Sequence, residues 1–333
     1  MMPIVVGIVS LLLLLVAGGA AIVWFAAQLR GRRPASFLRV RKAVVVLPIA
    51  LMVGLGGILW FAATRSRAAR EDREIAQIQK SLETIRKLGG RIGFHDGYVV
   101  AVDLGGTRTT DAGLEQVSHL DRLEALDLHL TNVTDRGMEH LAQLTNLRKL
   151  TLFHTVVSDA GIEHLAGLAQ MRQLDLVDTN ITDDALVHLR AMRQLSELNL
   201  QGTWITDAGL KHLREAANLR ILLLPKGITD AGMEQLRHMK QLRELSLINS
   251  TVTDAAVEKI VQLKNLKRLW LNGTGVTLKG VNRIRRALPG CHVHFDAQAR
   301  WAAEWEAEWE TEREAAWDAD WAAQWEEETA QSR

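Results

Sequence analysis

Histidines are the residues of this chain whose spacing first suggests chemistry. Four of them recur at intervals of 24 residues, so they occupy one place in a repeating structure. Any repeated unit produces such a column, which therefore indicates a structural role. Two closer pairs could each give a metal ion two ligands, but neither spacing supplies a third. The column is His140, His164, His188 and His212, and the pairs are His129 with His154 and His292 with His294.

The chain lacks the motifs that usually mark an active site. It has no phosphate-binding loop, no GxSxG, no HExxH and no glycine-rich dinucleotide turn. Cys291 is the single cysteine, which excludes an internal disulfide and any zinc site built from cysteines. We therefore expect a non-catalytic protein with no cofactor and no metal.

A repeated unit of 24 residues organises the chain from Val99 to Pro289. The fullest copy, Leu123–Asn146, reads LEALDLHLTNVTDRGMEHLAQLTN. A fixed period of this length is the signature of a solenoid. One copy, at Leu219, is a residue short. The copies start at Val99, Leu123, Leu147, Met171, Leu195, Leu219, Leu242 and Leu266.

The columns of the unit predict a strand, a turn and a short helix. Positions 1, 4 and 6 are apolar, and the alternation at 4 and 6 is typical of a strand with one buried face. Position 12 is always Thr or Ser, the types that cap a helix, and Asp follows in seven of eight copies. Position 15 is Gly six times and Ala twice, which indicates a demand for small size where neighbouring turns touch.

This pattern resembles the leucine-rich repeat family. The likeness rests on an LxxLxL strand, as in Leu147–Leu152, and a T-x-(I/V)-T-D-x-G-(L/M) turn, as in Thr203–Leu210. That turn is similar to the variant of many bacterial repeat proteins and of F-box adaptors. The commonest family form has Asn at position 9, where seven copies of this chain have Thr or Ser, whose hydroxyl could bridge adjacent turns. The resemblance implies an α/β solenoid with a parallel sheet on its concave face, and it implies binding as the function.

Strand positions 3, 5, 7 and 8 are expected to point to the concave face, where such proteins usually bind a protein partner. Their side chains make a polar and acidic centre with a few large apolar members that could serve as anchors. The predicted binding face comprises Asp103, Asp127, His129, Thr151, Phe153, His154, Asp175, Asp178, Asn199, Gln201, Leu223, Glu244, Trp270 and Asn272.

Two apolar runs precede the repeats and predict a transmembrane hairpin. The first helix covers residues 4–28 and the second residues 43–64, each long enough to cross a bilayer, with a basic loop at 29–42 between them. A cleaved signal peptide is the alternative for the first run, but a signal peptide usually has a shorter apolar core behind a positive start. We expect a multi-pass protein of the cell membrane.

The basic loop predicts the orientation of the hairpin. Positive loops stay in the cytoplasm, so both termini and the repeats should lie on the exported or periplasmic side. Four arginines that follow the second run, Arg65, Arg67, Arg70 and Arg73, oppose this orientation. The alternative is an adaptor that faces the cytoplasm and resembles F-box-type repeat proteins, although residues 65–98 show no recognisable F-box.

Residues 65–98 are expected to form a helical spacer followed by the N-terminal cap of the solenoid. Ile75, Ile78, Leu82 and Ile85 recur at helical spacing, which suits a solvated spacer or a helix that pairs in a dimer. The repeats and a C-terminal cap occupy residues 99–296, because Leu278 replaces the Asp of the last copy and Pro289-Gly290 ends its helix.

The last part of the chain, residues 297–333, is an acidic tail rich in tryptophan. Residues 301–333 hold eleven acids and two bases, a net charge of −9, whereas the whole chain carries +1. Ala and Glu favour a helix. The alternatives are a frayed tail or a helix whose tryptophans dock on a partner or on the repeats of this chain. Its acidity argues against binding to nucleic acid.

Overall fold

The structure is a computed structural model that describes residues 65–67, 70 and 72–296. The predicted transmembrane helices, the basic loop and the tryptophan-rich tail lie outside these residues. No helix within the described part is long and apolar enough to cross a membrane. The chain divides into two compact units, residues 1–76 and 77–333. In the first, residues 72–76 are helical, and the account below concerns the second.

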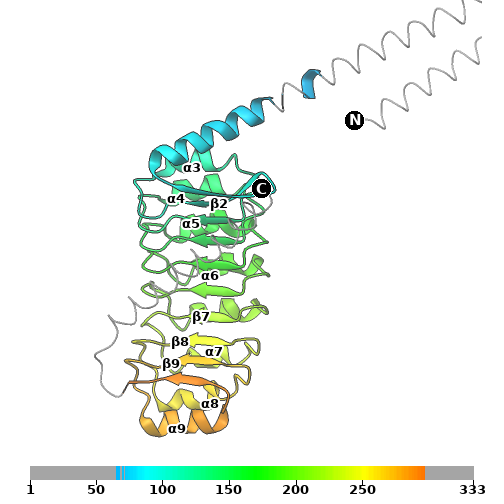
Figure 1. The fold of residues 1–333 in the computed structure, drawn as a ribbon. Helices are drawn as coiled ribbons and strands as arrows, with labels where there is room; N and C mark the ends of the chain where they lie inside the picture. The colour runs from blue at the N-terminus through cyan, green and yellow to red at the C-terminus, as the bar shows by residue number, and fades with distance from the viewer. Residues whose placement is uncertain (1–64, 68–69, 71, 297–333) are drawn as a thin grey trace, which may run out of the picture. The chain divides into compact units, whose positions relative to one another are not determined.

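Ten strands of the second unit form one sheet in chain order (Figure 1). The first two strands pair antiparallel, and each later strand pairs parallel to the one before it. The repeat therefore places one strand in each unit, three residues long in every unit after the first, as the alternation predicts. The strands are β1 Arg91–His95, β2 Tyr98–Asp103, β3 Ala125–Asp127, β4 Lys149–Thr151, β5 Gln173–Asp175, β6 Glu197–Asn199, β7 Ile221–Leu223, β8 Glu244–Ser246, β9 Arg268–Trp270 and β10 His292–His294.

A short helical segment follows each strand from β2 to β9. These segments differ in length and type: α3 and α4 are seven-residue α-helices, whereas η3 is wholly 3₁₀. The segments are α3 Asp111–Val117, α4 Asp135–Leu141, α5 Asp159–His164, η1 Leu165–Gly167, α6 Ala185–His188, η2 Leu189–Ala191, η3 Gly209–Glu215, α7 Met233–Leu236, η4 Asp254–Ala256, α8 Val257–Ile260 and α9 Leu278–Ala287.

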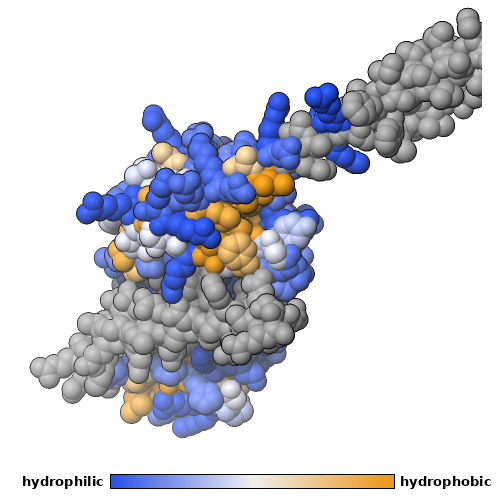
Figure 2. Space-filling model, turned by 45° about the horizontal axis from the view of Figure 1, so that its top comes forward, coloured by the Kyte–Doolittle hydropathy of each residue, from blue (hydrophilic) through white to orange (hydrophobic). Residues whose placement is uncertain are grey.

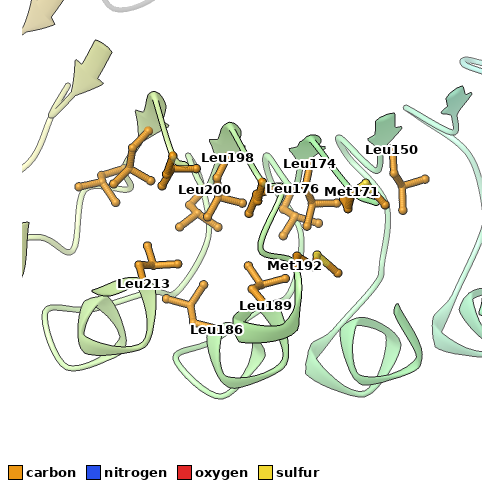
Figure 3. Close-up of a cluster of buried hydrophobic side chains, with 14 of the residues drawn as sticks. Leu150, Met171, Leu174, Leu176, Leu186, Leu189, Met192, Leu198, Leu200 and Leu213 are labelled. Atoms are coloured by element: carbon orange, nitrogen blue, oxygen red, sulfur yellow. The ribbon is translucent and has the colours of Figure 1, made fainter. Parts of the chain in front are cut away.

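The core consists of leucine rows that run through the stack of units. Leu126, Leu150, Leu174 and Leu198 lie opposite one another on successive strands and are all buried. Figure 3 shows strand leucines facing leucines of the helical side, such as Leu186. Burying one leucine side chain contributes about 1.5–3 kcal/mol, and each unit buries several that it could not cover alone. The buried strand face that positions 4 and 6 predict is confirmed.

The N-terminal end of the solenoid is covered by two elements. The hairpin of β1 and β2 turns at Asp96 and Gly97, both in the left-handed region. Residues 77–88 are helical and bury Ile85, and the Ser81 hydroxyl donates to the Gln116 carbonyl at 2.7 Å. Ile78, Leu82 and Ile85 of this helix pack on the core of the solenoid, so the helix contributes to the N-terminal cap.

An aspartate ladder joins each unit to the next on the helical side of the turn. In each unit the Asp of position 13 accepts two hydrogen bonds from the Thr or Ser of position 12 in the following unit. The backbone N–H donates to Oδ1 at 2.7–2.9 Å and the hydroxyl to Oδ2 at 2.6–2.8 Å. The pairs are Asp111–Thr134, Asp135–Ser158, Asp159–Thr182, Asp183–Thr206, Asp207–Thr229, Asp230–Thr253 and Asp254–Thr277.

The predicted capping role of position 12 is confirmed in six of the eight units, where the hydroxyl accepts a hydrogen bond from a backbone amide of the following turn at 3.2–3.4 Å, whereas Thr110 and Ser158 make no such bond. The same hydroxyl donates its hydrogen to the carboxylate of the preceding unit, which is a strong acceptor. Position 9 departs from expectation. The Thr155 hydroxyl donates to the Leu152 carbonyl of its own turn at 2.7 Å and does not bridge units.

The ladder explains why position 15 must be small. A Cβ added to Gly137, Gly161 or Gly209 would lie closer than 3.0 Å to the ladder carboxylate of the preceding unit. None of these glycines has a positive φ, so the backbone conformation does not require glycine, and the restriction at position 15 is on the size of the side chain. The expected close approach between neighbouring turns is confirmed, and the group that approaches is the aspartate.

Candidate functional site

The concave face is built from the strand residues that point away from the leucine core. Position 5 lies directly opposite its counterpart on each neighbouring strand, so seven predicted residues form one row. The four members at position 7 and the two at position 8 follow in the turns, and Glu244 precedes the row. The row contains Asp103, Asp127, Thr151, Asp175, Asn199, Leu223 and Trp270.

The N-terminal part of the concave face is a polar cluster of Asp103, Asp127 and His129. One ligating atom from each lies within 4.8 Å of the others. Arg91 binds Asp103 at 2.6 Å, and the His129 ring nitrogen Nδ1 lies 2.8 Å from Asp127 Oδ1. The sequence paired His129 with His154, but the structure places His154 beside Asp178, with Nε2 and Oδ2 3.5 Å apart. The carboxylates of Asp103 and Asp127 already have cationic or N–H partners within the protein. Contacts among these residues therefore hold the cluster together.

The His129 ring occupies the space beside Gly105. A Cβ at Gly105 would collide with that ring, so glycine is required for the cluster to close. Asp103 Oδ1 accepts the Gly105 amide at 2.8 Å, which fixes the turn from the other side. Repeat columns do not reveal this arrangement, because the three residues come from two different units.

The C-terminal part of the concave face is an apolar patch of Leu223, Ile248 and Trp270. They are 2%, 8% and 6% exposed, yet they are not part of the leucine core. His294 stacks on Trp270 with ring centroids 5.2 Å apart. Burial, followed by the nearby charges of His292 and Arg268, lowers the pKa of His294, so this ring stays neutral near pH 7. Of the predicted anchors, Phe153 is also buried but lies three units away from this patch.

Position 8 gives the concave face its exposed rim. Leu130, His154, Asp178 and Asn249 have φ between 50° and 57°, and glycines hold the same conformation in three other units. A non-glycine residue in this region costs roughly 1–2 kcal/mol. The turn projects its side chain outward: Leu130 is 55% exposed, and His154 and Asp178 are the two members of the predicted face that are exposed and not half-buried or buried. Sequence reasoning missed Leu130, which the three glycines of its column could have signalled.

A basic row borders the concave face at position 2, and sequence reasoning missed it as well. Its members are exposed cations that precede the strands of five units, with Ser196 in the unit between them. Backbone hydrogen bonds link them directly, for example from the Arg172 amide to the Arg148 carbonyl at 2.7 Å. Reading down column 2 of the repeat would have found it. The basic row consists of Arg148, Arg172, Arg220, Arg243 and Lys267.

The histidine column lies on the helical side, away from the concave face. His164 Nε2 is 3.7 Å from Glu139, and Arg190 donates to His212 Nδ1 at 2.6 Å. Burial and then the positive charges of Arg190 and Lys211 lower the pKa of His212. Each ring has a different neighbour, which agrees with a column produced by repetition and not by a shared ligand.

Comparisons with known proteins agree with this architecture. Residues 192–213 match the family model described as Leucine Rich repeat. No curated protein matches the chain. Among solved structures, an internalin (inlF) from Listeria monocytogenes is 23% identical, with a TM-score of 0.50. That match covers 60% of this chain and 54% of the internalin, so about half of that protein is spanned.

Two further solved structures are similar at lower scores. Internalin C2 from Listeria monocytogenes is 22% identical over 60% of this chain and 82% of that chain, with a TM-score of 0.47. A leucine-rich-repeat protein from Leptospira interrogans is 24% identical over 54% of this chain and 57% of that chain, with a TM-score of 0.37. Residues 192–213 therefore match a leucine-rich repeat, and the sheet of stacked units around them has the fold of a leucine-rich-repeat solenoid.

Proposed function

We propose that the solenoid is a non-catalytic module that binds a protein partner on its concave face. The supporting observation is the composition of that face, which places an apolar patch and a polar cluster on one continuous sheet. Large apolar side chains such as Trp270 and Leu223 supply binding energy, while hydrogen bonds made by Asp178 and Gln201 fix the orientation of the partner. The leucine-rich repeat match and the solenoid fold support this class of function.

We further propose that residues 4–28 and 43–64 anchor the protein in the cell membrane, with the repeats on the exported side. The support is the length and apolar character of both runs and the six cations of the 29–42 loop. The four arginines after the second run favour the reverse orientation, in which the repeats would act as a cytoplasmic adaptor.

Site-specific photo-crosslinking tests the binding face. A photoreactive amino acid at Gln201, which is half-exposed on the concave face, should capture a discrete protein in native membranes. The same probe at Glu163, exposed on α5, is the matched control and should capture none. Equal capture from both positions, or capture from Glu163 alone, would contradict a concave binding face.

Reporter fusions test the orientation. An enzyme that is active only outside the cytoplasm, fused after Arg333, should be active if the repeats are exported. An enzyme that is active only inside, fused at the same place, should then be inactive. The opposite pair of results would support the cytoplasmic adaptor.

A further inference from the structure

The basic row is a line of like charges that the described residues leave largely uncompensated. Arg148 forms an ion pair with Glu124 at 3.2 Å. Within residues 72–296, no side-chain hydrogen bond or ion pair joins any of the other four members to a partner. Strands in a sheet lie about 4.8 Å apart, so neighbouring cations of the row repel one another. An anionic ligand with charges spaced along its length would remove that repulsion.

The apolar patch lies on the same strands as the C-terminal half of the basic row. Leu223, Ser246 and Trp270 are direct neighbours across β7, β8 and β9, and the units of these strands supply Arg220, Arg243 and Lys267. The surface therefore offers cations along one border and apolar side chains beside them.

Two polar atoms add to this surface. Asn199 Nδ2 and Ser246 Oγ are buried without a hydrogen-bond partner. Buried polar groups normally have a partner, so each is a place where a ligand could donate or accept a hydrogen bond. A ligand that fits would combine carboxylates, large apolar rings and a polar backbone.

We propose that residues 301–333 of this chain bind along the concave face, with tryptophans on the apolar patch and carboxylates on the basic row. This segment lies outside the described residues, and the argument for it rests on sequence and reach. It carries a net charge of −9 and six tryptophans at multiples of four residues. It starts five residues after Asp296, which follows β10 at the end of the same sheet.

The length of the segment suits this surface. Even as a helix rising 1.5 Å per residue, 33 residues extend about 50 Å. The nine parallel strands from β2 to β10, about 4.8 Å apart, extend about 38 Å. The segment can therefore run back along the whole concave face from the end at which it is attached.

This inference rests on the proposed function, because it assigns the same face two competing occupants. The tail holds the face in the free protein, and a partner must displace it. Binding of the tail to the concave face can be measured without any partner, so either proposal can be disproved while the other holds. Capture at Gln201 with no tail binding overturns this inference alone, and tail binding with no capture overturns the proposed function alone.

The test uses the full-length chain in detergent with a protease site inserted between residues 297 and 300. After cleavage and removal of the tail, a fluorescent peptide of residues 301–333 is titrated and its anisotropy is measured. We expect saturable binding. Charge reversal in Arg220→Glu with Arg243→Glu should weaken it at least about tenfold. The control pair Arg136→Glu with Arg214→Glu, exposed on the helical side, should change it less than about twofold.

Peptide variants keep the test valid if a protein variant fails to fold. A peptide with Trp317, Trp321 and Trp325 changed to Ala should bind at least about tenfold more weakly. A peptide whose glutamates are changed to Gln should lose affinity and lose the salt dependence of binding. Absence of saturable binding to the cleaved protein, or unchanged affinity of both peptide variants, would overturn the proposal. So would equal losses from the two arginine pairs.

Discussion

The aspartate ladder and the basic row are both lines of identical charge produced by repetition, but they have opposite surroundings. Each carboxylate of the ladder accepts two hydrogen bonds from the next unit. The cations of the basic row project into solvent, and only Arg148 has an ion pair there among the described residues. A column of charged side chains therefore holds the units together when those side chains form hydrogen bonds between one unit and the next. A column without such bonds is available to a ligand.

The largest effect should come from breaking the core that both lines share. Leu174→Asp places an unpaired carboxylate at a 2%-exposed position between Leu150 and Leu198. We expect a loss of at least about 4 kcal/mol in the free energy of unfolding, which would remove the cooperative transition. Circular dichroism during heating measures it. A cooperative melt like that of the wild type would show that the residue does not lie in the core.

The next largest effect should come from removing one ladder carboxylate. Asp183→Ala leaves the Thr206 amide and hydroxyl without their acceptor. We expect a loss of about 1–3 kcal/mol in urea denaturation. Asp184→Ala is the matched control, since Asp184 is the exposed neighbour and its side chain makes no capping hydrogen bond to α6. Equal losses from both variants would show that the ladder does not join the units.

A double-mutant cycle sharpens this by testing the close approach at Gly209. In the wild type, Gly209→Ala brings a Cβ against the Asp183 carboxylate and should destabilise the protein by about 1 kcal/mol. In an Asp183→Ala background the clash is gone, and the same change should stabilise it by about 0.5 kcal/mol, because alanine restricts the unfolded chain. The same sign in both backgrounds would contradict the contact.

A smaller effect is expected from pH. The Thr277 hydroxyl and then the Thr277 amide lower the pKa of Asp254 below its usual value. A carboxyl group with a depressed native pKa stabilises the fold above the unfolded pKa, which is near 3.9, and this contribution is lost as pH falls through the native pKa. Asp254→Asn should therefore lose less stability than the wild type between pH 5 and pH 3, measured by urea denaturation. Equal losses would mean that the Thr277 bonds do not hold the ionised form.

The smallest effect should come from the basic row. In the protein cleaved to remove residues 301–333, Arg220→Gln with Arg243→Gln removes two exposed charges that form no hydrogen bond or ion pair among the described residues. The free energy of unfolding should therefore change by less than about 0.5 kcal/mol. Urea denaturation of the cleaved protein at low salt is the measurement. A loss of more than 1 kcal/mol in the free energy of unfolding would show that the basic row, like the aspartate ladder, stabilises the fold.

The periodic features of the fold could be predicted because each column repeats one environment eight times. The leucine rows, one strand per unit and the small residue at position 15 all follow from such columns. The partner of each aspartate did not follow. It lies 22 or 23 residues away, and periodicity cannot distinguish a bond within a unit from one between units.

Features outside the columns were missed for a different reason. The helix of residues 77–88 occurs once, and its apolar stripe alone suits a spacer, a dimer or a cap equally. The cluster of Asp103, Asp127 and His129 depends on one side chain filling the space beside Gly105. The left-handed turn at position 8 holds Leu130 and His154 as well as glycines, so residue type hides a conformation that the units share.

The face of the molecule in Figure 2 is largely hydrophilic, with apolar side chains gathered in one area. A hydrophilic exterior of this kind lets the units differ in their surface residues while the leucine rows stay constant.

The unit that begins at Leu219 is one residue short, and the turn takes up the difference. Lys226 is not in the left-handed conformation of its counterparts, whereas Asp207 still reaches Thr229 at 2.6 Å. The spacing between neighbouring units thus does not depend on the length of their loops. We therefore expect single-residue deletions or insertions in this turn to leave the structure of the units on either side unchanged. Variation in length can therefore accumulate beside the proposed binding face without loss of the scaffold.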